Sequence, residues 1–169
     1  MIKTVQVSNV ARMAPVCHID IDGYVPLRWR SYADLIKIAR LRFGNFSESL
    51  FEFLLDQEDM TIRGMALISV DSIHRPKAAT GLPRTLGLPI LNLLTKDFLN
   101  EAYGLRIDAE VPFSVGYGDD FVEVDLGGME EAGRIIQCDQ AEFYLKLETL
   151  LGVRVIGLTA EQMLQIRQF

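Results

Sequence analysis

Three groups of polar side chains in this sequence have the types and spacing to do chemistry. In the first, His18, Asp20 and Asp22 alternate with apolar residues, so on a β-strand their side chains share one face, about 7 Å apart. A carboxylate can orient an imidazole, and the two together can hold a divalent ion. These three are therefore candidate catalytic residues, and the alternative is a strand with one wet face that leads into a hairpin.

An acidic cluster lies near position 120. Glu123 and Asp125 are expected on the outward face of a strand together with Phe121, while the intervening apolar residues face the core. Carboxylates beside an aromatic ring suit a basic protein partner, whereas the ligand pattern of an EF-hand is missing and no metal site is predicted. A solvated strand face is the alternative. The predicted binding residues are Tyr117, Asp119, Asp120, Phe121, Glu123 and Asp125.

The third group is basic and lies in a long connection expected over residues 71–88. Long connections of this kind often have a function, and arginine offers a bidentate fork to a phosphate or carboxylate. The candidate anion-binding residues are His74, Arg75, Lys77 and Arg84. A basic surface loop that offsets an acidic body is the alternative.

Other chemistry has less support in the sequence. There is no G-x-S-x-G nucleophile elbow and no dinucleotide-binding glycine pattern, so no cofactor is predicted. The two cysteines, Cys17 and Cys138, lie 121 positions apart without a CxxC pair or a Cys/His cluster. They are expected to be ordinary reduced thiols.

Size and charge bound the class of protein. A chain of 169 residues with 49% hydrophobic residues is expected to form one domain over residues 1–169. Its 17 basic and 23 acidic residues give a net charge of -6, which disfavours general nucleic-acid binding. No apolar run has the length of a membrane span, and no secretion signal is recognised, so a cytoplasmic protein without membrane association is expected; the oligomeric state is left open.

The expected elements form an α+β domain, in which an N-terminal hairpin around Asp22-Gly23 and a C-terminal meander build an antiparallel sheet. About four helices are expected to pack against this sheet. They are predicted near residues 32–41, 50–55, 90–103 and 140–151, and a short closing helix is predicted after Thr159. Leu50, Phe53 and Leu54 are predicted core residues.

These patterns favour a non-catalytic, acidic protein-binding module of the inhibitor, antidote or adaptor type, with a basic protein as its partner. The alternative is a small enzyme or carrier that binds an anionic small molecule through His18, Asp20 and Asp22 together with Arg75. Whether the chain catalyses a reaction is left open.

Overall fold

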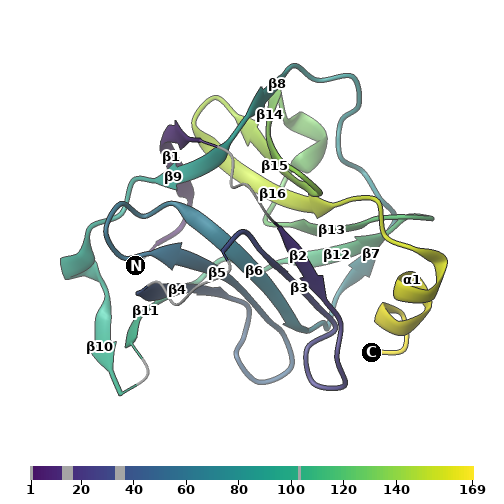
Figure 1. Cartoon of the computed structure of the whole chain (residues 1–169), viewed down its shortest axis with the longest axis horizontal. Helices are drawn as coiled ribbons and strands as arrows, with labels where there is room; N and C mark the ends of the chain where they lie inside the picture. The colour runs from purple at the N-terminus through teal and green to yellow at the C-terminus, as the bar shows by residue number, and fades with distance from the viewer. Residues whose placement is uncertain (1, 13–16, 33–36, 103) are drawn as a thin grey trace.

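The structure, a computed structural model, describes residues 2–12, 17–32, 37–102 and 104–169, and it is built mainly of β-strands (Figure 1). Of the residues that the structure describes, 51% lie in strands and 8% are helical. The expected α+β domain with about four helices is therefore wrong, because the described residues form two β-sheets and one α-helix.

The first sheet has seven strands in the order β10-β11-β4-β5-β6-β3-β2. Neighbouring strands are antiparallel except β4 and β11, which are parallel. The strands are β2 (His18–Asp20), β3 (Leu27–Arg30), β4 (Ile38–Phe43), β5 (Leu50–Asp56), β6 (Ile62–Ser69), β10 (Leu99–Glu101) and β11 (Gly104–Ala109).

The second sheet has nine strands, seven of them in the order β7-β12-β13-β16-β15-β14-β8. The remaining two are β1, which pairs with both β16 and β9, and β9 itself. The strands are β1 (Val5–Ala11), β7 (Ile73–His74), β8 (Arg84–Leu86), β9 (Leu88–Leu91), β12 (Ser114–Tyr117), β13 (Val122–Asp125), β14 (Arg134–Cys138), β15 (Ala141–Lys146) and β16 (Thr149–Val155).

The hydrophobic core lies between the inner faces of these two sheets. Phe143 on β15 is 6.0 Å from Trp29 on β3 and 6.3 Å from Phe53 on β5, measured between ring centroids. All three side chains are completely buried. Aromatic contacts thus join the two sheets at their centre, as in other β-sandwiches.

The four expected helices are strands or short turns. Residues 38–43 and 50–56 form β4 and β5, residues 140–151 contribute to β15 and β16, and residues 90–103 contain the end of β9, a 3-10 turn (η1, Thr95–Asp97) and β10. Residues 33–36 and 103 of the expected helices lie outside the described residues. Along β4 the side chains alternate between the core and the outer side of the sheet: Ala39, Leu41 and Phe43 are fully buried, whereas Arg40 and Arg42 between them are partly exposed.

Two sequence predictions about local elements are confirmed. The hairpin at Asp22-Gly23 joins β2 to β3, with Ile19 opposite Trp29. The closing helix is α1 (Ala160–Ile166), and Thr159 begins it with a capping box, in which the Thr159 hydroxyl accepts from the Gln162 amide. No helix in the described ranges is long and apolar enough to cross a membrane.

Candidate functional site

Acidic side chains are buried on the outer face of the nine-stranded sheet. Glu123 on β13 is completely buried, and its carboxylate accepts hydrogen bonds from Arg154 Nη2 (2.7 Å) and from the backbone amide of Lys77 (2.8 Å). His74 Nδ1 lies 3.9 Å from the same carboxylate. One carboxylate thus contacts residues from β16 and from the basic connection that follows β7.

Asp125, two residues further along β13, has its own set of partners. Lys77 Nζ is 2.6 Å from one carboxylate oxygen, and the other oxygen accepts the backbone N–H groups of Gly127 and Met129. The ammonium of Lys77 also lies 3.7 Å from Glu130. Asp125 therefore fixes both the basic connection and the turn after β13.

Glu142 on β15 completes the acidic row. It is 3% exposed, forms an ion pair with Arg84, and accepts a hydrogen bond from the Tyr144 hydroxyl at 2.8 Å. In the register of the sheet, Glu123 lies opposite Arg154 and Arg154 lies opposite Glu142. Two residues of the predicted basic group, His74 and Lys77, thus contact Glu123 and Asp125 of the predicted acidic cluster. The partner of Arg84, Glu142, belongs to neither predicted group.

Glu123 and Asp125 lie on the expected outer side of the sheet, but their expected exposure is wrong, because another part of the chain covers that side. Ala78 is buried in a small apolar cluster on that side with Met129, Ala132, Ile135 and Tyr144, and Leu82 packs against it. Strand alternation correctly separates the carboxylates from the inner valines, but both faces of β13 are covered. These two carboxylates are consequently not available to a partner on the surface.

The other predicted binding residues lie around the β12–β13 turn. Asp119 and Asp120 are exposed there. Tyr117 and Phe121 are half-buried, and the Arg154 guanidinium lies 4.1 Å above the Phe121 ring. Phe121 thus helps to cover the buried ion pair.

The first predicted group is divided between a strand and a turn. His18 and Asp20 lie on the edge strand β2, where the Asp20 carboxylate is 3.3 Å from Arg30. Asp22 accepts the backbone N–H groups of Tyr24 and Val25, and these hydrogen bonds lower the pKa of its carboxyl. Among the described residues, no hydrogen bond or ion pair joins these three to the exposed Arg75.

A further charged surface lies on the outer face of the seven-stranded sheet. From β2 to β11, one row of neighbouring residues across the sheet contains Asp20, Arg28, Ala66, Glu52, Arg42 and Asp108, and the next contains His18, Arg30, Gly64, Leu54, Arg40 and Arg106. We call the five arginines of these rows, Arg28, Arg30, Arg40, Arg42 and Arg106, the arginine face.

Carboxylates hold several guanidinium groups of the arginine face in fixed orientations. Arg42 makes a two-point contact with Asp108 at 2.8 and 3.0 Å, and Arg106 contacts Glu101 at 2.7 Å. Two-point contacts of this kind restrict the guanidinium plane. Arg42 also lies 5.0 Å from the ring of Phe46, which is 40% exposed.

A hollow of about 360 Å³ opens on this face, lined by Arg40, Arg42, Glu52, Glu101, Gly104, Leu105 and Arg106. Glu52 is its most buried acid, 13% exposed and 3.8 Å from Arg40. Burial raises the pKa of the Glu52 carboxyl, although the arginines nearby act in the opposite direction. The hollow therefore combines three guanidinium groups with the Glu52 carboxyl, whose burial disfavours its charged form.

No family model matches the sequence, and no curated protein matches it. The assignment of a function therefore depends on the geometry of this chain alone.

The sequence analysis missed the arginine face, although the sequence contains a signal for it. Arginines recur two positions apart in Arg28-Trp29-Arg30 and again in Arg40-Leu41-Arg42, which is the period of a strand with a charged outer face. The second pair was assigned to the end of a helix, so its alternation was not recognised.

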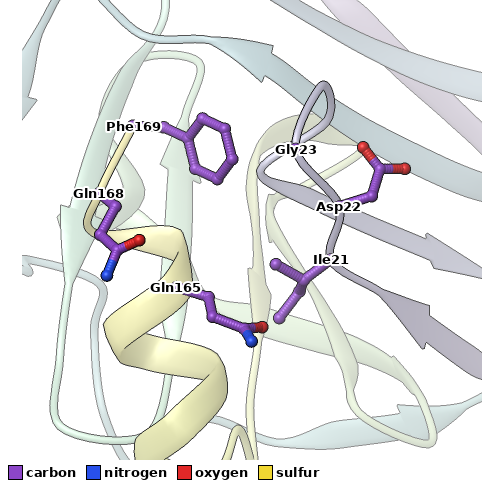
Figure 2. A pocket seen from close by; sticks show the side chains of 6 residues that line it. All are labelled: Ile21, Asp22, Gly23, Gln165, Gln168 and Phe169. Atoms are coloured by element: carbon purple, nitrogen blue, oxygen red, sulfur yellow. The ribbon is translucent and has the colours of Figure 1, made fainter.

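A second hollow, of about 250 Å³, lies between the β2–β3 turn and α1 (Figure 2). Ile21 and Gln165 point toward each other across it, and the Phe169 ring lies on its rim. Its acidic residue, Asp22, already accepts two backbone hydrogen bonds. Within the described residues, no group of three or more His, Cys, Asp or Glu side chains could hold a metal ion.

Proposed function

We propose that this chain is a non-catalytic protein-binding module whose arginine face holds an acidic segment of a partner protein. The observation that carries this proposal is the arrangement of five partly exposed arginines in two adjacent rows on one sheet face. The carboxylates from which a basic partner was predicted, Glu123 and Asp125, are buried and neutralised within the chain. The partner that we propose is therefore acidic, whereas the partner predicted from the sequence was basic.

The size of the arginine face favours a protein segment over a small anion. Arg28 on β3 and Arg106 on β11 are separated by four strand spacings, or about 19 Å at the usual distance between strands. An extended segment that crosses the sheet would place carboxylates near several of the guanidinium groups. Arginine is enriched in protein interfaces because one side chain offers charge, several hydrogen-bond donors and a flat stacking surface.

The charge pattern of the face also supports a protein partner. Four carboxylates, Asp20, Glu52, Glu101 and Asp108, lie between or beside the arginines. Such alternation disfavours an unbroken polyanion but can fix the register of an acidic segment in which neutral residues separate the carboxylates. Phe46 and Leu99, which are 40% and 60% exposed at the border of the face, offer apolar contacts.

The proposal can be tested by fluorescence anisotropy with a labelled peptide of alternating Glu and Thr. We expect saturable binding to the wild type, at least tenfold weaker binding to Arg40→Glu/Arg106→Glu, and weaker binding as salt rises because exposed charges are screened. The matched control is Lys3→Glu/Arg75→Glu, which makes the same change in net charge at two exposed positions outside the arginine face. Circular dichroism establishes that both variants fold.

Equal losses in the two double variants would show that only net charge matters, and absence of saturable binding would overturn the proposal. A labelled single-stranded RNA is the comparison ligand. Tighter binding of the RNA than of the acidic peptide would replace the protein partner with a nucleic acid.

A second candidate function is the binding of a small anionic molecule, as in a carrier or a small enzyme. The observation that favours it is the hollow between Arg40, Arg42 and Arg106, whose volume lies within the range of ligand pockets. Citrate should then raise the midpoint of thermal unfolding of the wild type in a saturable way and leave that of Arg106→Gln unchanged. This site differs from the predicted combination of His18, Asp20, Asp22 and Arg75.

A further inference from the structure

The two cysteines of the chain are in contact. Cys17 and Cys138 lie 121 positions apart in the sequence, yet their Sγ atoms are 3.8 Å apart. Both are free thiols in this structure. A disulfide bond is about 2.05 Å long, so the two sulfurs have to approach each other by roughly 1.8 Å to form one.

The contact joins the two sheets. Cys17 immediately precedes β2, the edge strand of the seven-stranded sheet, and packs partly buried against the core. Cys138 is the last residue of β14 in the nine-stranded sheet and is fully buried. A bond between the two would therefore connect one layer of the sandwich to the other.

We propose that Cys17 and Cys138 form an intramolecular disulfide when the folded protein meets a low-molecular-weight disulfide of the glutathione type. The pair is thus a site of reversible oxidation. This inference does not depend on the proposed binding function.

Thiol–disulfide exchange provides a balanced route to this bond. The Cys17 thiolate attacks one sulfur of oxidised glutathione, the glutathione S–S bond breaks, and one glutathione thiolate leaves. The Cys138 thiolate then attacks the Cys17 sulfur of the mixed disulfide, and the second glutathione thiolate leaves. Two protein thiols are oxidised, one glutathione disulfide is reduced to two thiols, and the two protons pass to the leaving thiolates.

The different burial of the two sulfurs sets the order of these steps. Cys17 is the accessible partner, whereas complete burial keeps Cys138 away from an oxidant and from the cysteines of other molecules. Burial, the neighbouring Cys138 and the charge of Asp139 raise the pKa of the Cys17 thiol to about 12. Little thiolate is present at neutral pH, so the reduced form survives brief exposure and the bridge forms slowly.

The bridge should stabilise the fold because it closes a loop of more than a hundred residues in the unfolded chain. A disulfide of this kind typically raises the midpoint of thermal unfolding by roughly 4–16 °C in a chain of this size. The expected gain applies to the oxidised protein relative to the same protein after reduction.

The test is incubation of the folded protein with oxidised glutathione, followed by mass spectrometry under non-reducing conditions. The mass of the wild type should fall by that of two hydrogen atoms, and the tryptic peptides 13–28 and 135–146 should be recovered as one linked species until dithiothreitol separates them. In urea, where unfolding exposes and separates the thiols, glutathione should instead accumulate on both cysteines, with little of the intramolecular link.

Cys17→Ser is the control, since it removes the accessible thiol and leaves the buried one in place. Its oxidant-treated and untreated forms should unfold at the same temperature. Cys138→Ala, a smaller apolar replacement, is the second control and should retain one glutathione on Cys17 without any link. Intact thiols in the folded wild type, a stable glutathione adduct instead of the link, covalent dimers, or an unchanged unfolding midpoint after linking would each overturn the proposal.

Discussion

Each buried carboxylate of the nine-stranded sheet depends on a cation that reaches it from another part of the chain. Glu123 has no exposed surface, and Arg154 lies directly opposite it in the register of β13 and β16. Moving a charge out of water is costly, and this cost is compensated only while the partner is present. The ion pair therefore makes the fold sensitive to the loss of either residue.

The first prediction concerns this pair. Arg154→Met should lower the free energy of unfolding by about 3–5 kcal/mol, because it leaves the Glu123 carboxylate buried without its cation. The double variant Glu123→Gln/Arg154→Met should recover much of the loss. Urea unfolding measures all three proteins, and Arg75→Met, at an exposed position, is the control that should change stability by less than about 0.5 kcal/mol. A single variant as stable as this control would contradict the assigned role of the pair.

The second prediction concerns Glu52 in the hollow of the arginine face. Burial raises the pKa of this carboxyl above its ordinary value of 4.5, so the folded state binds the proton more tightly than the unfolded state. The stability that Glu52 contributes is therefore present below about pH 4.5 and is lost as pH rises toward the folded-state pKa. Glu52→Gln should gain stability relative to the wild type between acidic and neutral pH, as measured by urea unfolding at both. A constant difference between the two proteins at all pH values would contradict this.

The burial of Glu123 could not be predicted from its own strand. Alternation with Val122 and Val124 identifies the side of the sheet on which the carboxylate lies, and this part of the prediction agrees with the structure. Whether that side is wet depends on the connection that carries Lys77, more than forty positions away. Local periodicity contains no information about such a cover.

At the scale of elements, some strands have buried side chains on both faces, and this is why the sequence predicted helices in their place. Phe51, Phe53 and Leu55 face the core from β5, but Leu54, on the opposite side, is only 7% exposed. The resulting apolar run resembles a buried helix, because periodicity alone does not separate the two. The prediction that Phe53 is a core residue is confirmed by its burial. Leu54 is buried as predicted, but on the outer side of the sheet, and Leu50 is only half-buried.

The third prediction compares the loss of unfolding free energy caused by two substitutions on β5, because a strand and a helix predict different losses. Phe53→Ala should cost about 3–5 kcal/mol, because a fully buried ring in contact with Phe43, Phe51 and Phe143 leaves a cavity. Leu50→Ala should cost clearly less, since the side chain of Leu50 is half-buried. On a helix the two residues, three positions apart, would share one face, and comparable losses in urea unfolding would contradict the strand.

At the scale of the whole molecule, β1 pairs with strands from two distant parts of the chain. Val5 lies opposite Leu150 on β16, while Val7 and the residues after it pair with β9. Ile90 on β9 in turn forms a bridge with Thr61, next to the seven-stranded sheet. One strand thus connects segments from the beginning, the middle and the end of the chain, so a local change there should act on both layers.

The fourth prediction tests this coupling with Val7→Asp and Ser8→Asp, neighbouring positions on opposite faces of β1. Val7 is 3% exposed, so an aspartate there places an unpaired charge in the core and should cost more than about 3 kcal/mol. Ser8 is exposed, and the same side chain there should cost less than about 1 kcal/mol. Trp29, the one tryptophan of the chain, reports on the other sheet, so its fluorescence and the far-ultraviolet circular dichroism should give the same lowered midpoint in Val7→Asp. If the circular dichroism alone shifted while Trp29 kept its wild-type transition, β1 would be a local appendage, and the two sheets would unfold as separate units.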